Sequence, residues 1–240
     1  MIIQRFARNS IGRDFAVGDI HGRFDLLRDC MEDVNFDGRT DRMFSAGDLV
    51  DRGPHSLEAV SWIGQRWFHP VLGNHEIVAM DVAAGKHDAE HYLKNGGLWF
   101  LKLTDEQRHA IACVFATLPY AIEIETSRGL VGIVHAEIRG NSWRDFIADF
   151  QAVQSNNKRK AFIERCCWSR DIIDAWNKSQ AVPEPIHDLH KLIVGHSRVP
   201  EPLQIGNIHY IDTGAYKTGN LTVIQIDGPT HYPPNHWSNP

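Results

Sequence analysis

Five short apolar runs in this 240-residue chain each end in polar side chains, and in four of them a glycine comes directly before the polar residue. The runs are residues 15–19, 43–48, 70–74, 130–135 and 191–196. Between the first three runs, residues 23–36 and 56–67 repeat apolar positions at steps of three and four, which predicts helices. This alternation favours a layered α/β fold. Because ligands bind beyond the carboxyl ends of strands in open α/β sheets, we expect the five polar ends to meet at one rim.

The polar ends combine carboxylates, an amide and imidazoles, namely Asp19, His21, Asp48, Asn74, His135 and His196. Nitrogen and oxygen donors of this kind suit manganese, iron or zinc. Asp19 and His21 are two residues apart, so we expect both on one face of an extended strand end. Asp48 is the candidate bridging ligand, because a carboxylate has two oxygens and paired catalytic cations lie roughly 3.5–4 Å apart. The first metal is expected at Asp19, His21 and Asp48, and the second at Asp48, Asn74, His135 and His196.

The rest of the chain is less regular. Thr104 and Gln107 form a capping box that predicts a helix to about Leu118. Residues 120–126 and 130–135 predict a hairpin, and residues 208–212 and 221–226 predict closing strands. Residues 137–190 are polar and weakly periodic, so we expect them to wander over the surface. We expect one domain over residues 1–228, followed by a loosely held tail, residues 229–240, whose His231 and His236 are incidental.

Bulk properties exclude some classes of protein. The formal net charge of −5 argues against bulk binding of nucleic acid. No apolar stretch approaches the ~20 residues of a membrane span, and residues 1–13 lack the apolar run of a signal peptide. The four cysteines form no Cys-x-x-Cys pair, which indicates reduced thiols. We therefore expect a cytoplasmic protein with no nucleic-acid or membrane partner, and the oligomeric state stays open.

Three segments resemble the signature blocks of calcineurin-like metallophosphoesterases: residues 18–22 (Gly-Asp-Ile-His-Gly), 47–53 (Gly-Asp-Leu-Val-Asp-Arg-Gly) and 73–76 (Gly-Asn-His-Glu). Four later segments resemble the phage lambda-type and bacterial serine/threonine protein phosphatases: residues 95–100, 168–170, 194–197 and 210–215. The resemblance covers about residues 14–227. It implies an αββα sandwich of two mixed β-sheets flanked by helices, with two divalent metal ions that are usually Mn²⁺.

Further residues are expected to take part in hydrolysis at such a metal site. We expect a hydroxide that bridges the metals to attack phosphorus, because two cations lower the pKa of a shared water. His75 directly follows a metal ligand and is the candidate general acid. Asp51 is expected to orient the His75 ring, as the resemblance also implies. Arg52 and Arg170 are expected to clamp the phosphate with their planar guanidinium groups, and Asn74 to contact it.

Several alternatives remain open. Asp51 could instead cap a turn, and Arg170 could be a surface arginine beside Asp171. Protein phosphatases of this family usually carry arginine directly before the third block, where this chain has Leu72. The symmetrical dinucleoside tetraphosphate hydrolases typically have leucine there, but they usually lack the counterpart of Asp51.

The leading hypothesis is a Mn²⁺-dependent serine/threonine protein phosphatase or broad phosphomonoesterase, acting on a phosphoprotein or a small phosphoester. The alternative is a symmetrical dinucleoside tetraphosphate hydrolase. A third hypothesis, from another class, is a non-catalytic module that binds phosphoproteins.

Overall fold

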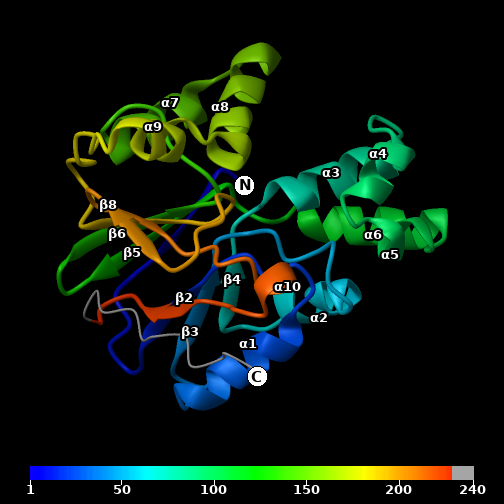
Figure 1. Ribbon diagram of the computed structural model, residues 1–240, viewed down its shortest axis with the longest axis horizontal. Coiled ribbons are helices and arrows are strands. Elements are labelled where there is room, and N and C mark those ends of the chain that lie inside the picture. The colour runs from blue at the N-terminus through cyan, green and yellow to red at the C-terminus, as the bar shows by residue number, and fades with distance from the viewer. Residues whose placement is uncertain (229–240) are drawn as a thin grey trace.

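Two mixed β-sheets form the centre of the computed structural model, which describes residues 1–228 (Figure 1). The smaller sheet contains four strands: β2 (Asp14–Val17), β3 (Arg42–Ser45), β4 (Phe68–Pro70) and β10 (Val223–Gln225). Their order is β10-β2-β3-β4, and only the β10–β2 pair is antiparallel. The parallel order of β2, β3 and β4 brings their carboxyl ends to one edge of the sheet.

The larger sheet contains six strands: β1 (Ile3–Phe6), β5 (Ala121–Thr126), β6 (Gly129–Val134), β7 (Lys191–Val194), β8 (Leu203–Ile205) and β9 (Ile208–Tyr210). Their order is β1-β5-β6-β7-β9-β8. The β5–β6 and β8–β9 pairs are antiparallel, and the other pairs are parallel. The predicted hairpin is confirmed, since β5 and β6 pair around the turn at Ser127 and Arg128. The carboxyl ends of β6 and β7 point the same way.

Helices cover the outer faces of both sheets. Those before β5 are α1 (Phe24–Asp33), the 3₁₀ turn η1 (Ser56–Glu58), α2 (Ala59–Ile63), α3 (Asn74–Ala83), α4 (Ala89–Lys94), α5 (Leu98–Leu101) and α6 (Asp105–Phe115). Those after β6 are α7 (Trp143–Ala152), α8 (Asn156–Trp168), α9 (Asp171–Ser179) and α10 (Ala215–Thr218). None of the helices in this described part of the chain is long and apolar enough to cross a membrane.

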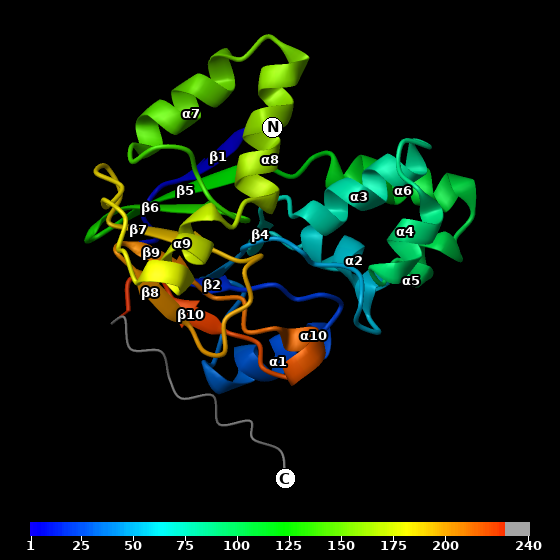
Figure 2. The ribbon, with the colours of Figure 1, turned by 45° about the horizontal axis from the view of Figure 1, so that its top comes forward.

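The two sheets share one apolar inner layer. Ala16 and Phe44 from the smaller sheet pack with Ile122, Ile133 and Ile193 from the larger sheet. A second apolar cluster lies between the smaller sheet and α1, α2, α3 and α6, and a third lies between the larger sheet and α7, α8 and α9. Figure 2 shows α7 and α8 on the side of the larger sheet that faces away from the smaller one. The predicted αββα sandwich is therefore confirmed.

The prediction for residues 137–190 is wrong, because they supply three helices and much of the third cluster. In α7, Trp143, Phe146, Ile147 and Phe150 recur at helical spacing and are buried. The outer surface of α8 carries a run of basic residues, 158–160, which lowers the average hydropathy of the segment. Its inner positions end in the buried Cys166 and Cys167. Short helices of this kind take their stability from packing against the sheet, which a polar average conceals.

Other element boundaries differ slightly from those predicted. The helix expected over 23–36 is α1, and the one expected over 56–67 begins as η1 and ends at Ile63. The capping box at Thr104 is confirmed, although α6 ends at Phe115 rather than Leu118. The strands β2, β3 and β4 end two or more residues before the polar side chains that follow them. Asp19 and Asp48 therefore lie on loops, where loop geometry sets their direction, whereas Asn74 is the first residue of α3.

Candidate metal centre and active site

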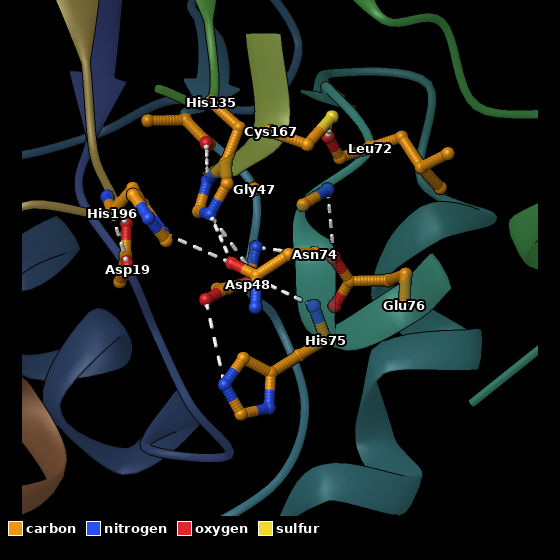
Figure 3. A network of polar contacts seen from close by, with 12 residues as sticks. Asp19, Gly47, Asp48, Leu72, Asn74, His75, Glu76, His135, Cys167 and His196 are labelled. Carbon is orange, nitrogen blue, oxygen red and sulfur yellow. Dashed lines mark hydrogen bonds and ion pairs between the residues drawn. The ribbon is translucent and has the colours of Figure 1, made fainter. Parts of the chain in front are cut away.

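The polar ends of the five runs meet at one rim. Those after β2, β3, β6 and β7 follow the strands on loops, and Asn74, which comes after β4, is the first residue of α3. Asp48 lies in the middle of this cluster, with Asp19, His135 and His196 toward one side and His75 toward another (Figure 3). Asp48 is almost completely buried, with 2% of its surface exposed. The six predicted metal ligands are therefore close together, although five separate segments of the sequence supply them.

Most of the unusual backbone in the described chain lies at this rim. Seven residues other than glycine have a positive φ, and five of them belong to the predicted site. These five are His21 (45°), Asp48 (48°), Asp51 (69°), Arg52 (68°) and His196 (59°). The expectation that Asp19 and His21 share a face of an extended strand is wrong, because His21 lies in the left-handed region. Such conformations cost of order 1–3 kcal/mol each and concentrate at functional sites.

Two groups of side chains could each hold a metal ion, and Asp48 belongs to both. His21, Asp48 and His75 form one group, and Asp48, His135 and His196 form the other. Oδ2 of Asp48 lies 3.6 Å from Nε2 of His21, whereas Oδ1 of Asp48 lies 3.4 Å from Nε2 of His135. The two oxygens of one carboxylate thus face two separate imidazoles, which is the arrangement that a bridging ligand requires.

Hydrogen bonds on the outer nitrogens direct the imidazole lone pairs inward. His135 Nδ1 donates to the carbonyl of Ala46 at 2.7 Å, and His196 Nε2 donates to the carbonyl of Trp168 at 3.0 Å. The remaining nitrogens, His135 Nε2 and His196 Nδ1, lie 2.9 and 3.0 Å from Oδ1 of Asn74. In the neutral form of each ring these two nitrogens present lone pairs toward oxygen atoms; burial lowers the pKa of His196, whereas at His135 the charge of Asp48 outweighs burial and raises the pKa. Metal-binding histidines are held in this way.

The His21 ring is fixed similarly. Its Nδ1 donates to the carbonyl of Val50 at 2.8 Å, so its Nε2 presents a lone pair, which lies 4.0 Å from Oδ2 of Asp19. Arg52 Nη1 donates to this nitrogen at 2.8 Å, so a positive group already meets the lone pair. Burial lowers the pKa of His21 well below its ordinary value and lowers that of His196 to about 3. Both rings are therefore neutral, as metal ligands must be.

Two carboxylates at the rim, Asp19 and Asp212, lack enough positive charge around them to offset burial, whereas the histidines around Asp48 hold its pKa well below its ordinary value. Burial, followed by the charges of Asp212 and Asp48, raises the pKa of Asp19 well above its ordinary value. Asp212 is itself buried, and its pKa is raised by burial and by Asp48. Buried carboxylates that repel one another in this way are stable as anions when cations lie among them. The donor set and its charge therefore fit two divalent metal ions.

His75 makes a separate contact on the far side of its ring. Its Nδ1 lies 2.6 Å from Oδ2 of Asp51. The other oxygen, Oδ1, accepts hydrogen bonds from Tyr92 Oη and Trp99 Nε1, each at 2.7 Å. Burial alone would lower the pKa of His75, but Asp48 and Asp51 together raise it above its ordinary value. Trp99, which packs against the apolar cluster behind the smaller sheet, is therefore also a hydrogen-bond donor to this carboxylate.

Glu76 is a structural member of the site, and its role was not predicted from the sequence. Its carboxylate accepts hydrogen bonds from the backbone amides of Gly73, Asp48, Leu49 and Val50, at 2.8–3.3 Å. It thereby joins the loop after β3 to the first turn of α3. Its position three residues after Gly73, the N-cap of α3, is the signal that could have identified it.

Two neighbouring cavities, which share three lining residues, lie at the rim. The inner one, about 280 Å³, is lined by residues that include Asp19, Asp48, Arg52, His75 and Arg170. The outer one, about 400 Å³, shares Arg52, Arg170 and His196 with it. Both predicted clamp arginines therefore border the space above the metal ligands. Arg52 also lies 4.5 Å above the ring of Tyr216.

Leu72 borders neither cavity. Its side chain is buried in the apolar cluster behind the smaller sheet, and its carbonyl accepts from Cys167 Sγ at 3.6 Å. The position before the third block therefore supplies no clamp, but its leucine does not touch the space open to a substrate either.

Fold and site together define a metallophosphoesterase. The chain belongs to the calcineurin-like phosphoesterase family, whose family model matches residues 15–217. It is a metal-dependent phosphatase.

Particular relatives agree with this assignment. The chain is 32% identical to serine/threonine-protein phosphatase 1 of Salmonella typhimurium, over 94% of this chain and 97% of that protein. It is also 32% identical to a symmetrical bis(5'-nucleosyl)-tetraphosphatase of Nitrosococcus oceani, over 56% of this chain and 54% of that protein. Among solved structures, a cold-active protein-tyrosine phosphatase from Shewanella has a TM-score of 0.56 at 18% identity, over 94% of this chain and 79% of that one. This last similarity concerns the fold alone.

Proposed function

We propose that this chain is a manganese-dependent serine/threonine protein phosphatase with broad phosphomonoesterase activity. The proposed metal ligands are Asp19, His21, Asp48, Asn74, His135 and His196. The observation that carries the proposal is that the two oxygens of Asp48 face His21 and His135 separately. Neutral imidazoles with oxygen donors suit manganese, and the similarity to a serine/threonine-protein phosphatase over almost the whole chain supports the substrate class.

The proposed mechanism assigns a distinct task to each remaining side chain. Bound cations supply charge neutralisation and an activated water as nucleophile. Arg52 and Arg170 hold the phosphate oxygens through planar, charge-assisted hydrogen bonds, and Asn74 assists them. His75 holds one proton on Nδ1 against Asp51, so its Nε2, which is 3.8 Å from Oδ2 of Asp48, carries the proton for the leaving oxygen.

We extend the proposal to organisation and location. Residues 1–228 act as one metallophosphoesterase domain, because both sheets contribute to one inner apolar layer and both contribute ligand loops. All four cysteines are free thiols, which supports a cytoplasmic location. The tail, residues 229–240, lies outside the described residues, and so do His231 and His236.

Hydrolysis of dinucleoside tetraphosphates is the second candidate. The similarity to the Nitrosococcus oceani enzyme favours it, and the outer cavity of about 400 Å³ leaves room for a substrate longer than one phosphate. Against it, Asp51 is present and is held by three hydrogen bonds.

One experiment separates the two candidates. The purified chain, stripped of metal and resupplied with Mn²⁺, is assayed on para-nitrophenyl phosphate, a phosphoserine peptide and diadenosine tetraphosphate, with Asp48→Asn as the inactive control. The proposal expects manganese-dependent phosphate release from the first two substrates. A higher kcat/KM for diadenosine tetraphosphate than for either phosphomonoester would support the second candidate instead. No metal-dependent release from any substrate would refute both.

A further inference from the structure

The outer cavity contains a third arginine that has no part in the proposed mechanism. Arg198 lies on the loop after β7, two residues beyond His196, and lines this cavity together with Arg52, Arg170 and Tyr216. Arg52 and Arg170 also line the inner cavity, whereas Arg198 does not. The three guanidinium groups therefore form a series that leads outward from the metal ligands.

The stem of Arg198 lies against the backbone of a neighbouring loop. A Cβ atom added to Gly214 would lie 2.5 Å from Cδ of Arg198 and 3.2 Å from its Cγ. Gly214 also has a φ of 76°, which a residue with a side chain rarely adopts. The amide of Gly214 donates to Oδ1 of Asp212 at 2.8 Å, so the loop is held in place. Because Gly214 has no side chain, the aliphatic part of the Arg198 side chain can occupy the space beside it.

The charged end of Arg198 is available for a ligand. Within residues 1–228, no carboxylate lies within 4.0 Å of its guanidinium, whereas other arginines, such as Arg42 with Asp14 and Arg165 with Glu137, are ion-paired. Arg198 is exposed to solvent. Two carboxylates border the same cavity. Asp212 interacts with the buried carboxylate of Asp48 at the metal centre, and Asp174 lies on the exposed side of α9.

We infer that Arg198 forms a second anion subsite beside the phosphate clamp, and that it selects phosphopeptides with an acidic side chain close to the phosphorylated residue. The inference rests on the proposed function. Arg52 and Arg170, which border both cavities, hold the phosphate that is cleaved. Arg198 borders the outer cavity only, so an anion that it binds is not the phosphate that is cleaved. That anion belongs to another part of the substrate. A guanidinium group binds a carboxylate through two parallel hydrogen bonds.

The test compares two phosphoserine peptides that differ only in one neighbouring residue, glutamate or glutamine. The ratio of their kcat/KM values is measured for the wild type, for Arg198→Met and for Lys217→Met. Lys217 is an exposed cation on α10 that borders neither cavity, so its loss changes the net charge equally. We expect the wild type and Lys217→Met to prefer the acidic peptide about tenfold, and Arg198→Met to show a ratio within about twofold of one. Arg198→Glu should favour a peptide with lysine at the same position.

Other results would overturn the inference. A wild type without an acidic preference, a preference that survives Arg198→Met, or an equal loss in Lys217→Met would each do so. A selective loss of diadenosine tetraphosphate hydrolysis in Arg198→Met, without any peptide preference, would assign the anion to a nucleotide and would overturn it too. Failure of the proposed function is separate: the wild type would then release no phosphate from either peptide, whatever the neighbouring residue.

Discussion

Nδ1 of His75 and Oδ2 of Asp51 lie 2.6 Å apart, and both side chains are buried. Tyr92 and Trp99 donate to the other oxygen of Asp51, so the carboxylate cannot rotate away from the imidazole without losing two hydrogen bonds. The ring of His75 is thereby fixed with its Nε2 toward the inner cavity. This geometry suits a proton donor, but His75 also lies close enough to Asp48 to belong to a group that could bind metal.

The variant His75→Asn decides between these two roles. We expect kcat for para-nitrophenyl phosphate to fall roughly 10²–10⁴-fold while the metal content per chain stays at the wild-type value, because only the proton donor is lost. Elemental analysis of the purified protein measures the metal, and steady-state assays measure kcat. A variant that loses metal in parallel with activity would show that His75 is a ligand instead.

The variant Asp51→Asn tests how the proton is held. A general acid works in its protonated form, so kcat falls as the pH rises through its pKa. Asp51 raises the pKa of His75, and its neutral replacement should move the alkaline limb of the kcat profile to lower pH. The comparison variant Trp99→Phe removes one hydrogen bond to Asp51 but keeps the carboxylate. It should shift the limb less, and an unmoved limb in Asp51→Asn would contradict the assignment.

The four amide hydrogen bonds to Glu76 predict a stability effect. In Glu76→Gln, the amide group presents a donor to backbone N–H groups, so at least one buried amide loses its acceptor. We expect the free energy of unfolding to fall by about 1–3 kcal/mol and the affinity for Mn²⁺ to weaken, because the loop that carries Asp48 loosens. Glu90→Gln, which breaks an exposed ion pair with Lys94, is the matched control and should change stability by under about 1 kcal/mol. Equal effects of the two substitutions would refute this role.

His69 predicts part of the pH dependence of stability. It packs against Phe6 and Phe44, and burial together with Arg42 lowers its pKa from 6.5 to about 4. Between these values the unfolded chain binds a proton that the folded chain does not, so His69 makes stability fall as the pH drops from about 6.5 toward 4. The urea midpoint of His69→Gln should therefore change less between pH 7 and pH 5 than that of the wild type. His109→Gln, at an exposed position, should keep the wild-type difference.

The sequence predicted the residues of the site more accurately than the secondary structure around the site. Asp19, Asp48 and Asn74 were predicted to meet because strands bring their carboxyl ends to one edge, and this holds although Asp19 and Asp48 lie on loops beyond the strands and Asn74 begins α3. The left-handed backbone at His21 could not be predicted, because it depends on contacts with the loop after β3, where the His21 amide donates to the carbonyl of Asp48.

Helices with one narrow apolar face were the least predictable part. Only a few positions of α7 and α8 are buried, and the residues between them are charged, so a local average indicates a surface segment. The formation of α7 and α8 depends on packing against the larger sheet. The strands of that sheet come partly before and partly after these two helices in the sequence. The position of the Leu72 side chain could not be predicted either, because no local pattern shows whether a residue at a strand end faces the core or the cavity.

Anomalous diffraction from crystals grown with Mn²⁺ tests the central claim most directly. We expect two manganese peaks per chain roughly 3.5–4 Å apart, one on each side of the Asp48 carboxylate, with His21 beside one peak and His135 beside the other. A single peak, peaks remote from Asp48, or no peak at this rim would contradict the account.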